Sequence, residues 1–453
     1  MTRGGEVVGE LAVDPVRGRV YAEGWQSWSP ATWSPVTASP RRPEHHWQHL
    51  MRFRPGTPVH REAFQGEGLL VVDPGTGDPA HCYRAAAGRH DVPTVHAVLE
   101  HDRVVVRATG DVATTEHVDG GEAALAAYGD ELAAARGPLP SGAPPTVWCS
   151  WYRYFEEVTA DDVRDNLHAI ESHDLPVDVV QVDDGWSAGL GEGLLPSARF
   201  GSLVGLVEEI RSTGRRAGLW AAPFLVGVET TLARDHADWL VGPAGRNWGQ
   251  ALAGLDLTHP GVQELLVDAL GRLTALGIDY LKLDFLYGGA VPGRRHDDVD
   301  GVTAYRRGLE LVRDAVGPHV YLVGCGAPLL PSVGLVDAMR VSPDTFHEGG
   351  EDGSTGLRGL MPMAARAWQH GRLWVNDPDC VVARPTYAHR ERWAALAREY
   401  GGLRSFSDRV AELDGSGLAI VRRLLADTVD AGTPFPLERI RSGAEVAQRE
   451  VTR

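Results

Sequence analysis

The stretch Tyr280-Leu281-Lys282-Leu283-Asp284 has the composition of a short buried strand that ends in a carboxylate. The run Met339-Arg340-Val341-Ser342-Pro343-Asp344 ends in the same way. Acidic residues at the C-terminal ends of apolar strands are typical of α/β barrels, which carry their reactive groups at that end. Two carboxylates that face one bond are the groups that cleave glycosides. The two runs therefore suggest both a fold and a chemistry.

Between residues 141 and 404, short apolar runs alternate with amphipathic helical patterns, which is typical of a parallel sheet flanked by helices. Some helices carry start signals, such as the capping-box pair Thr159 and Asp162 and the first-turn Pro260. The candidate strands lie at 147–152, 177–182, 217–222, 254–257, 280–284, 320–323, 338–341 and 373–375. Eight strand–helix units in a region of about 250 residues predict a (β/α)8 barrel.

The parts on either side of this region differ from it. Residues 1–140 are rich in Pro, Gly and strand-like runs, and 92–99 with 103–107 predict a hairpin. We therefore expect a β-sandwich-like N-terminal domain, with the Pro/Gly-rich segment 137–145 at its boundary. Residues 405–453 predict a short, partly helical C-terminal tail. Its last 20 residues or so are polar, and we expect them to be disordered.

Composition limits the partners. The net charge of −17, from 44 basic and 61 acidic residues, argues against nucleic acid or an anionic membrane surface as a partner and favours a neutral ligand. The start of the chain has no apolar signal-peptide core, and no run of about 18 apolar residues occurs. The four cysteines have no CxxC spacing. These features predict a cytoplasmic protein with reduced thiols.

The second candidate strand ends in Val182-Asp183-Asp184-Gly185-Trp186. Two carboxylates there can accept hydrogen bonds from sugar hydroxyls, and a Trp can cover an apolar sugar face; the alternative is simple turn formation or helix capping. Capping alone explains the whole set of acidic strand ends less well. That set is Asp183, Asp184, Asp256, Asp284, Asp344 and Asp377.

Cations accompany the two opening carboxylates. Lys282 lies two residues before Asp284, so both side chains point to the same side of a strand. In the barrel lumen Lys282 would keep Asp284 ionised and lower its pKa, which suits a nucleophile; the alternative is a structural ion pair. Arg340 stands in a similar relation to Asp344. A carboxylate pair can also bind a metal, but the only metal-like cluster, Glu44-His45-His46-Trp47-Gln48-His49, lies far away in sequence, and we predict neither metal nor other cofactor.

In these motifs the chain resembles glycoside hydrolase family 36, the retaining α-galactosidases. Five motifs occur in the family's order, and the N-terminal Gly24-Trp25-Gln26-Ser27-Trp28-Ser29 resembles the family weakly. The five are Trp148-Cys149-Ser150-Trp151, Asp183-Asp184-Gly185-Trp186, Gly218-Leu219-Trp220, Leu255-Asp256-Leu257 and Lys282-Leu283-Asp284.

The resemblance implies a role for each matching residue. Asp284 would be the nucleophile and Asp344 the general acid/base, about 5 to 6 Å apart in a double-displacement mechanism. Asp183 and Asp184 would hold the 4- and 6-hydroxyls of the terminal sugar, and Lys282 its 3- and 4-hydroxyl side. The remaining substrate-binding residues would be Trp151, Trp186, Trp220, Cys325, Arg340 and one N-terminal Trp, Trp25 or Trp28.

The chain also departs from the family pattern. Leu283 and Leu286 replace the usual Trp and Asn, and Ala222-Pro223-Phe224 replaces Glu-Pro-Glu. The N-terminal domain is short for the family, and the C-terminal β domain is absent or vestigial. The expected substrate is an α-galactoside or oligosaccharide. A transglycosylase, an enzyme for a related sugar such as an α-N-acetylgalactosaminide, a non-catalytic sugar-binding barrel and a metal-dependent hydrolase stay open, as does a homo-oligomer.

Overall fold

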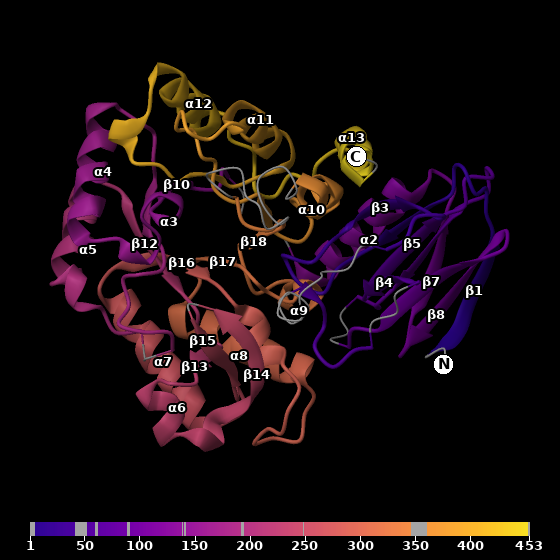
Figure 1. Ribbon diagram of the computed structural model, residues 1–453, viewed down its shortest axis with the longest axis horizontal. Coiled ribbons are helices and arrows are strands. Elements are labelled where there is room, and N and C mark those ends of the chain that lie inside the picture. The colour runs from indigo at the N-terminus through magenta and orange to yellow at the C-terminus, as the bar shows by residue number, and fades with distance from the viewer. Residues whose placement is uncertain are drawn as a thin grey trace.

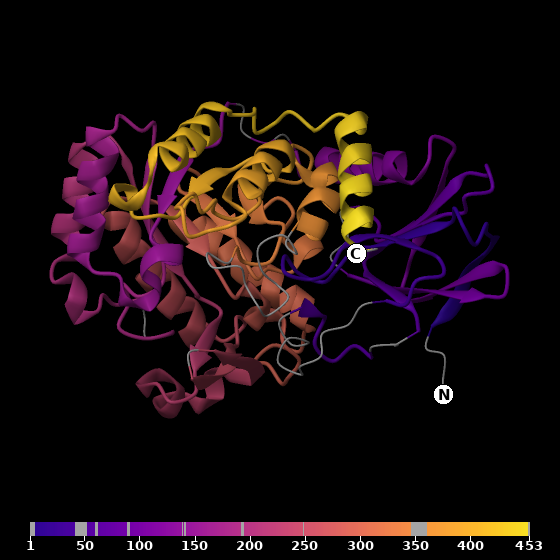
Figure 2. The same cartoon turned by 45° about the horizontal axis from the view of Figure 1, so that its top comes forward.

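A β-sandwich lies beside a parallel barrel in the computed structural model of the chain (Figure 1). The structure describes residues 5–40, 52–58, 62–87, 91–137, 139, 142–191, 194–247, 249–345 and 360–451. The sandwich occupies the N-terminal part of the chain. Two helices from distant parts of the sequence, α2 (Gly121–Arg136) and α13 (Leu437–Val451), lie where the sandwich meets the barrel (Figure 2).

The sandwich consists of two antiparallel sheets with a shared core. One sheet has the order β1 (Glu6–Ala12), β8 (Arg103–Thr109), β7 (Thr94–Glu100), β4 (Phe64–Glu67). The other has the order β3 (Thr32–Pro35), β2 (Arg19–Ala22), β5 (Leu69–Asp73), β6 (Ala80–Arg84), β9 (Ala113–His117). Valines from both sheets, such as Val72 and Val106, fill the space between them. The predicted β7–β8 hairpin is confirmed.

The predicted barrel is confirmed as eight parallel strands. In spatial order they are β19 (Val375–Asp377), β18 (Ala338–Arg340), β17 (Tyr321–Gly324), β16 (Ile278–Leu283), β12 (Arg216–Ala221), β11 (Val179–Val182), β10 (Thr146–Cys149) and β20 (Arg404–Phe406). Between the two end strands, the carbonyl of Asn376 accepts hydrogen bonds from the amides of Gly402 and Leu403. These bonds bridge the remaining gap.

The predicted number of eight barrel strands is right, but one predicted strand lies outside the barrel and one barrel strand was not predicted. The run predicted at 254–257 overlaps β15 (Gln250–Leu255), which pairs antiparallel with β13 (Leu225–Gly227) and β14 (Leu240–Asn247) outside the barrel. The eighth strand is instead β20, which also crosses the domain boundary expected at residue 404. Asp284 therefore follows the fourth barrel strand and Asp344 the sixth, where the fifth and seventh were expected.

The helices around the barrel follow the local signals in the sequence. The capping box at Thr159 and Asp162 is present and starts α4 (Ala160–Ser172). Pro260 is the first residue of α7 (Pro260–Ala275), and α5 (Leu203–Ser212) and α8 (Gly301–Val316) also flank the barrel. None of the helices within the described ranges is long and apolar enough to cross a membrane.

The C-terminal tail is more ordered than we expected. Its described residues after β20 contain α12 (Gly415–Ala426) and α13, and no strand. The prediction of disorder for the last 20 residues is wrong for most of them, because α13 buries Ile440, Ala444 and Ala447 against the rest of the protein. The segment is polar overall, so its one apolar stripe was not recognised as the buried face of a helix.

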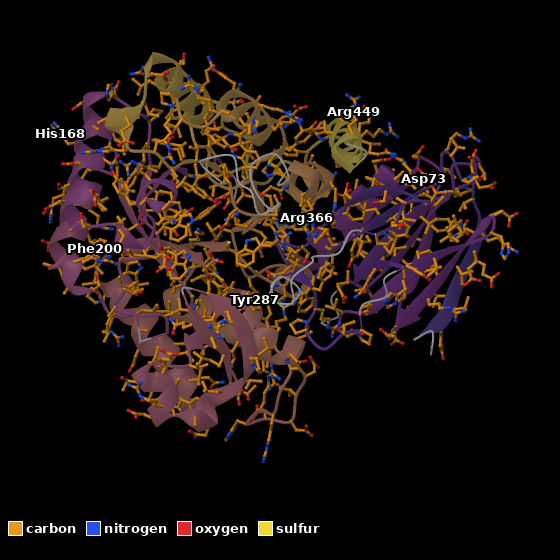
Figure 3. The ribbon with its side chains drawn as sticks, viewed as in Figure 1. Asp73, His168, Phe200, Tyr287, Arg366 and Arg449 are labelled. Atoms are coloured by element: carbon orange, nitrogen blue, oxygen red, sulfur yellow. The ribbon has the colours of Figure 1, made fainter. Side chains whose placement is uncertain are left out.

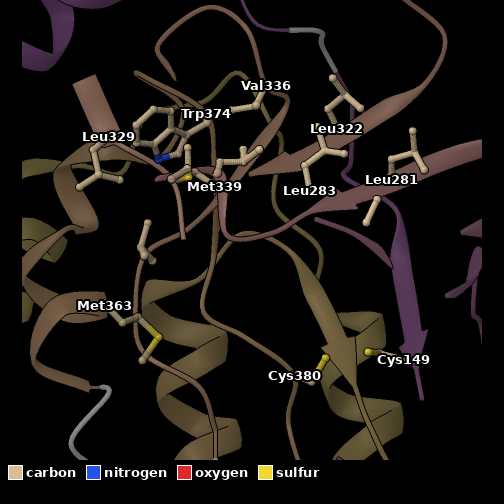
Figure 4. Packing of buried hydrophobic residues seen from close by; sticks show 14 of the residues in the cluster. Cys149, Leu281, Leu283, Leu322, Leu329, Val336, Met339, Met363, Trp374 and Cys380 are labelled. Carbon is tan, nitrogen blue, oxygen red and sulfur yellow. The ribbon is translucent and has the colours of Figure 1, made fainter. Parts of the chain in front are cut away.

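Strand alternation decides which residues reach the barrel lumen. Leu281 and Leu283 of β16 belong to the large outer core, which Figure 4 shows together with Leu322 and Met339. Tyr280 lies in a separate cluster with one small or apolar residue from each of several other strands, including Val147, Val179, Val323, Ala338 and Val375. Lys282 and Asp284 continue the Tyr280 side of the strand, so they stand above this layer at the C-terminal mouth.

Candidate active site

Lys282 links two carboxylates at the mouth of the barrel. Its Nζ donates to Asp183 Oδ2 at 3.0 Å and lies 4.0 Å from Asp284 Oδ2. Asp183 also accepts hydrogen bonds from Gln181 at 2.6 Å and from the thiol of Cys149 at 3.3 Å. Burial alone would lower the pKa of Lys282, but Asp183 and Asp284 outweigh it and hold that pKa well above its ordinary value. Lys282 therefore remains a cation at the centre of the site.

Asp284 is held rigidly at the end of β16. Its Oδ1 accepts from the amide of Phe285 at 2.7 Å, and its Oδ2 accepts from the indole Nε1 of Trp220 at 3.1 Å. Phe285 has a left-handed backbone with φ of 51°, which is rare outside glycine and places its amide beside the carboxylate.

Lys282 lowers the pKa of Asp284 as expected, but the net shift of this pKa is upward. Burial raises the pKa of Asp284 by more than Lys282 lowers it, and the charge of Asp344 raises it further. Lys282 lies closer to Asp183 than to Asp284, so its stabilising effect is divided. Protonation of Asp344 would remove one of the two effects that raise this pKa.

Asp344 has a different environment from Asp284. Its side chain is 43% exposed, and its Oδ1 accepts from Arg340 Nη2 at 2.9 Å. Arg340 is almost completely buried, and its other neighbours include Cys325 Sγ at 3.5 Å, Asp379 Oδ2 at 3.2 Å and Ser342 O at 3.3 Å. The site thus has one enclosed carboxylate and one that solvent reaches, with a buried cation beside each.

Asp184 is the fourth carboxyl group at the mouth, after Asp183, Asp284 and Asp344. Its Oδ1 accepts from the amide of Gly185 at 2.7 Å. Burial, together with the nearby charge of Asp183, raises the pKa of Asp184 to about 7. A buried carboxyl group that is partly protonated near neutral pH can both donate and accept a hydrogen bond, which suits a ligand rich in hydroxyls.

This raised pKa predicts that the stability of the folded protein depends on pH. Between about pH 4 and 7 the folded chain keeps a proton on Asp184 that the unfolded chain has released, so stability falls as pH rises through this window. We expect Asp184→Asn, which cannot ionise, to be more stable than wild type at pH 8 by on the order of 1–2 kcal/mol, and equally stable near pH 4. Urea unfolding at pH 4, 6 and 8 measures this. A difference that is constant across pH would contradict it.

Aromatic side chains form one wall beside Asp284. The ring of Trp28 from the N-terminal domain lies 5.3 Å from that of Phe285 and 6.5 Å from that of Tyr287, both edge-on, and Trp220 lies 6.4 Å from Phe285. Tyr287 is marked in Figure 3. A Cβ at Gly326 would lie 3.0 Å from the Trp28 ring, and the left-handed φ of 52° at this position also favours glycine.

The structure favours Trp28 over Trp25 as the N-terminal tryptophan beside Asp284. Trp25 is buried under Arg54, whose guanidinium lies 5.3 Å from its ring centre, whereas Trp28 is half-buried and reaches the site. Both belong to the segment Gly24–Ser29, where Ser27 N donates to Ala327 O at 3.2 Å and Leu329 N donates to Trp25 O at 3.0 Å. This segment is therefore joined to the loop that follows β17.

Three other predicted residues have protein partners in the structure. Trp186 is fully buried and donates its indole N–H to Trp220 O at 2.7 Å, so it supports β12. Trp151 is half-buried and packs edge-on against Phe155. Asp256 follows β15 and accepts from Thr258 and the amide of His296.

The predicted metal-like cluster at 44–49 lies outside the described residues. Across the described ranges, no group of three or more His, Cys, Asp or Glu side chains is arranged to hold a metal ion.

Sequence reasoning missed Tyr152, Asp379 and the preference for Trp28. Tyr152 donates its hydroxyl hydrogen to Asp379, which lies beside Arg340. The signal for Asp379 was available, because Asn376-Asp377-Pro378-Asp379 follows a barrel strand and contains two acids. Trp28 had no comparable signal, because its contacts are made across two domains.

Comparisons with known proteins show which proteins this chain resembles. The Melibiase family model matches residues 136–311. The bifunctional alpha-galactosidase/sucrose kinase AgaSK of Mediterraneibacter gnavus is 29% identical over 153 residues, which are 31% of this chain and 16% of that protein. The probable alpha-galactosidase C of Aspergillus flavus is 33% identical over 138 residues, 26% of this chain and 18% of that protein. The matches thus span less than a fifth of these two relatives.

A solved structure covers far more of the chain. TtGalA, an alpha-galactosidase from Thermus thermophilus solved with stachyose, is 30% identical with a TM-score of 0.76, and the match covers 91% of this chain and 90% of that one. The GH36 alpha-galactosidase AgaA of Geobacillus stearothermophilus has a TM-score of 0.62 at 13% identity, covering 92% of this chain and 61% of that one, which is a similarity of fold.

Proposed function

We propose, because this chain belongs to glycoside hydrolase family 36, that it hydrolyses terminal α-galactosides with retention of configuration. The observation that carries the proposal is the pair of unlike carboxylates at one barrel mouth. Asp284 is enclosed and bonded to Trp220, and Asp344 is half-exposed and paired with Arg340. The charge of Asp344 also raises the pKa of Asp284. Retaining glycosidases use two carboxyl groups roughly 5 Å apart, one as the nucleophile and one as the acid/base.

In the first step, an oxygen of Asp284 attacks the anomeric carbon, and the bond to the leaving oxygen breaks as Asp344 gives that oxygen its proton. In the second step, Asp344 takes a proton from water, the water oxygen attacks the same carbon, and Asp284 leaves as a carboxylate. The first step needs Asp344 protonated and Asp284 ionised. These two requirements support each other, because a neutral Asp344 no longer raises the pKa of Asp284.

The sugar itself would be held by the remaining polar groups. Asp183 and Asp184 supply acceptors for two hydroxyls, and Lys282 supplies a donor between them and Asp284. Trp28, Phe285 and Trp220 supply an apolar wall. All four thiols are buried and none forms a disulfide, which supports our proposal that the protein works in the reducing cytoplasm.

The direct test uses a panel of nitrophenyl glycosides that differ in sugar and anomer. We expect turnover of the α-galactoside at least about 100-fold above that of the β-galactoside and the α-glucoside, because a single misplaced hydroxyl leaves buried acceptors unpaired. Proton NMR of the first product should find the α-anomer. First release of the β-anomer would exclude retention, and an equal or higher rate on the α-N-acetylgalactosaminide would change the assigned sugar. An added acceptor sugar separates hydrolysis from transfer.

A further inference from the structure

The loop after β19 contains a buried carboxylate that the proposed mechanism does not use. Asp379 is 4% exposed. Its Oδ2 accepts from the amide of Thr345 at 2.6 Å, lies 3.2 Å from Arg340 Nη2 and accepts the hydroxyl hydrogen of Tyr152. The same Arg340 nitrogen donates to Asp344 at 2.9 Å. One guanidinium nitrogen is therefore shared by Asp379 and Asp344.

Backbone contacts join this loop to the segment that leads to Asp344. Val341 N donates to Asp377 O at 3.0 Å, and Ser342 Oγ donates to Pro378 O at 2.9 Å. With the Thr345 amide, these bonds bind both sides of Asp344 to the Asp377–Asp379 loop. Asp379 itself has a left-handed backbone with φ of 78°, which Asp adopts more readily than most residues with a side chain.

Charges of both signs surround Asp379. Arg340 and Lys282 favour its ionised form, and Asp344 and Asp377 oppose it. Tyr152 and Tyr387 face it as well. Burial is the largest of these effects, and together they raise the pKa of Asp379 to about 6. At neutral pH Asp379 is thus mostly an anion.

The geometry points to Asp379 as a positioning residue that holds Arg340, and the segment bearing Asp344, in place for proton transfer to the leaving group. This inference rests on the proposed function and extends it to a residue outside direct contact with substrate. Without the charge of Asp379, the Thr345 amide and the Tyr152 hydroxyl lose an anionic acceptor, and Arg340 can turn wholly toward Asp344. Asp344 is then displaced from the position in which it meets the leaving group.

Substrates with different leaving groups test this role. A dinitrophenyl galactoside departs without needing a proton, whereas methyl α-galactoside needs one. We expect Asp379→Asn to lower kcat/KM for the methyl substrate by about 10- to 100-fold and to leave the dinitrophenyl substrate within about threefold. Equal losses on both substrates, or no loss on either, would overturn the inference.

A second variant and a matched control keep the result clear. Tyr152→Phe removes one hydroxyl donor to Asp379 and should lower the methyl rate selectively but less severely; if Asp379→Asn does not fold, an unselective effect of Tyr152→Phe overturns the inference. Asp408→Asn is the control, because Asp408 is equally buried, also has a pKa of about 6 and pairs with Arg384 rather than Arg340. It should show no selectivity. An inactive wild type on both substrates would instead refute the proposed function.

Discussion

Replacing Asp284 by Ala is expected to lower the turnover of an aryl α-galactoside by a factor on the order of 10^4 or more, because no other group can form the covalent intermediate. Asp284 is fixed by Trp220 and the Phe285 amide, and no neighbouring carboxylate can take its position without breaking its own bonds to Lys282 or Arg340. Steady-state kinetics with a nitrophenyl α-galactoside measures the loss.

Azide distinguishes this role from that of Asp344. In Asp284→Ala a small anion enters on the face that the carboxylate has vacated, so azide should restore turnover and give the β-galactosyl azide. In Asp344→Ala the covalent intermediate still forms from an activated substrate, so azide should give the α-galactosyl azide. The isosteric control Asp256→Asn changes an acid that lies outside the site and should stay within about threefold of wild type. If the two variants gave azide products of the opposite configurations, Asp344 would be the nucleophile and Asp284 the acid/base.

Breaking the pair between Arg366 and Glu23 is expected to destabilise the protein by about 3–5 kcal/mol, which is typical of a single charge left buried without its partner. The two side chains are 0% and 1% exposed and lie 2.8 Å apart. Arg366 also donates to the carbonyls of Ser27 and Val341 at 2.9 and 3.1 Å. Figure 3 places it where the N-terminal sheets meet the barrel.

The measurement is urea unfolding of Arg366→Met, Glu23→Leu and the double variant. Each single substitution should lower the free energy of unfolding by the full amount. The double substitution should lower it less, because no charge is then left buried alone. The exposed pair Arg164 and Glu209 is the matched control, and its removal should cost less than about 1 kcal/mol. Single variants as stable as the control would mean that water or another group compensates the buried charge.

The sequence predicted the barrel because strand and helix periodicity is local, and it predicted the acids because they follow apolar strands. It failed where distant contacts decide the structure. β20 has only three residues, two of them polar, and Arg404 is buried there because its guanidinium donates to backbone carbonyls such as Ala397 O and Gly401 O. The residues around Arg404 in the sequence give no signal that predicts these hydrogen bonds.

The sequence could not decide between Trp25 and Trp28 for a related reason. Both stand in one short segment of the N-terminal domain, and alternation does not separate them. Their environments are set by Arg54 on one side and Phe285 on the other. The pKa of Asp284 shows the same limit, since strand geometry placed Lys282 on its side but burial outweighed the charge.

The pairing of Arg366 with Glu23 also bears on the order of events during synthesis. Glu23 belongs to the part of the chain that is made first, and its cation is 343 positions later. Until residue 366 leaves the ribosome, the N-terminal sheets hold an acid that has no counter-charge from this partner, and Trp28 has no Phe285 to pack on. The N-terminal domain should therefore complete its final packing only after most of the barrel has been translated, although domains made first often fold first.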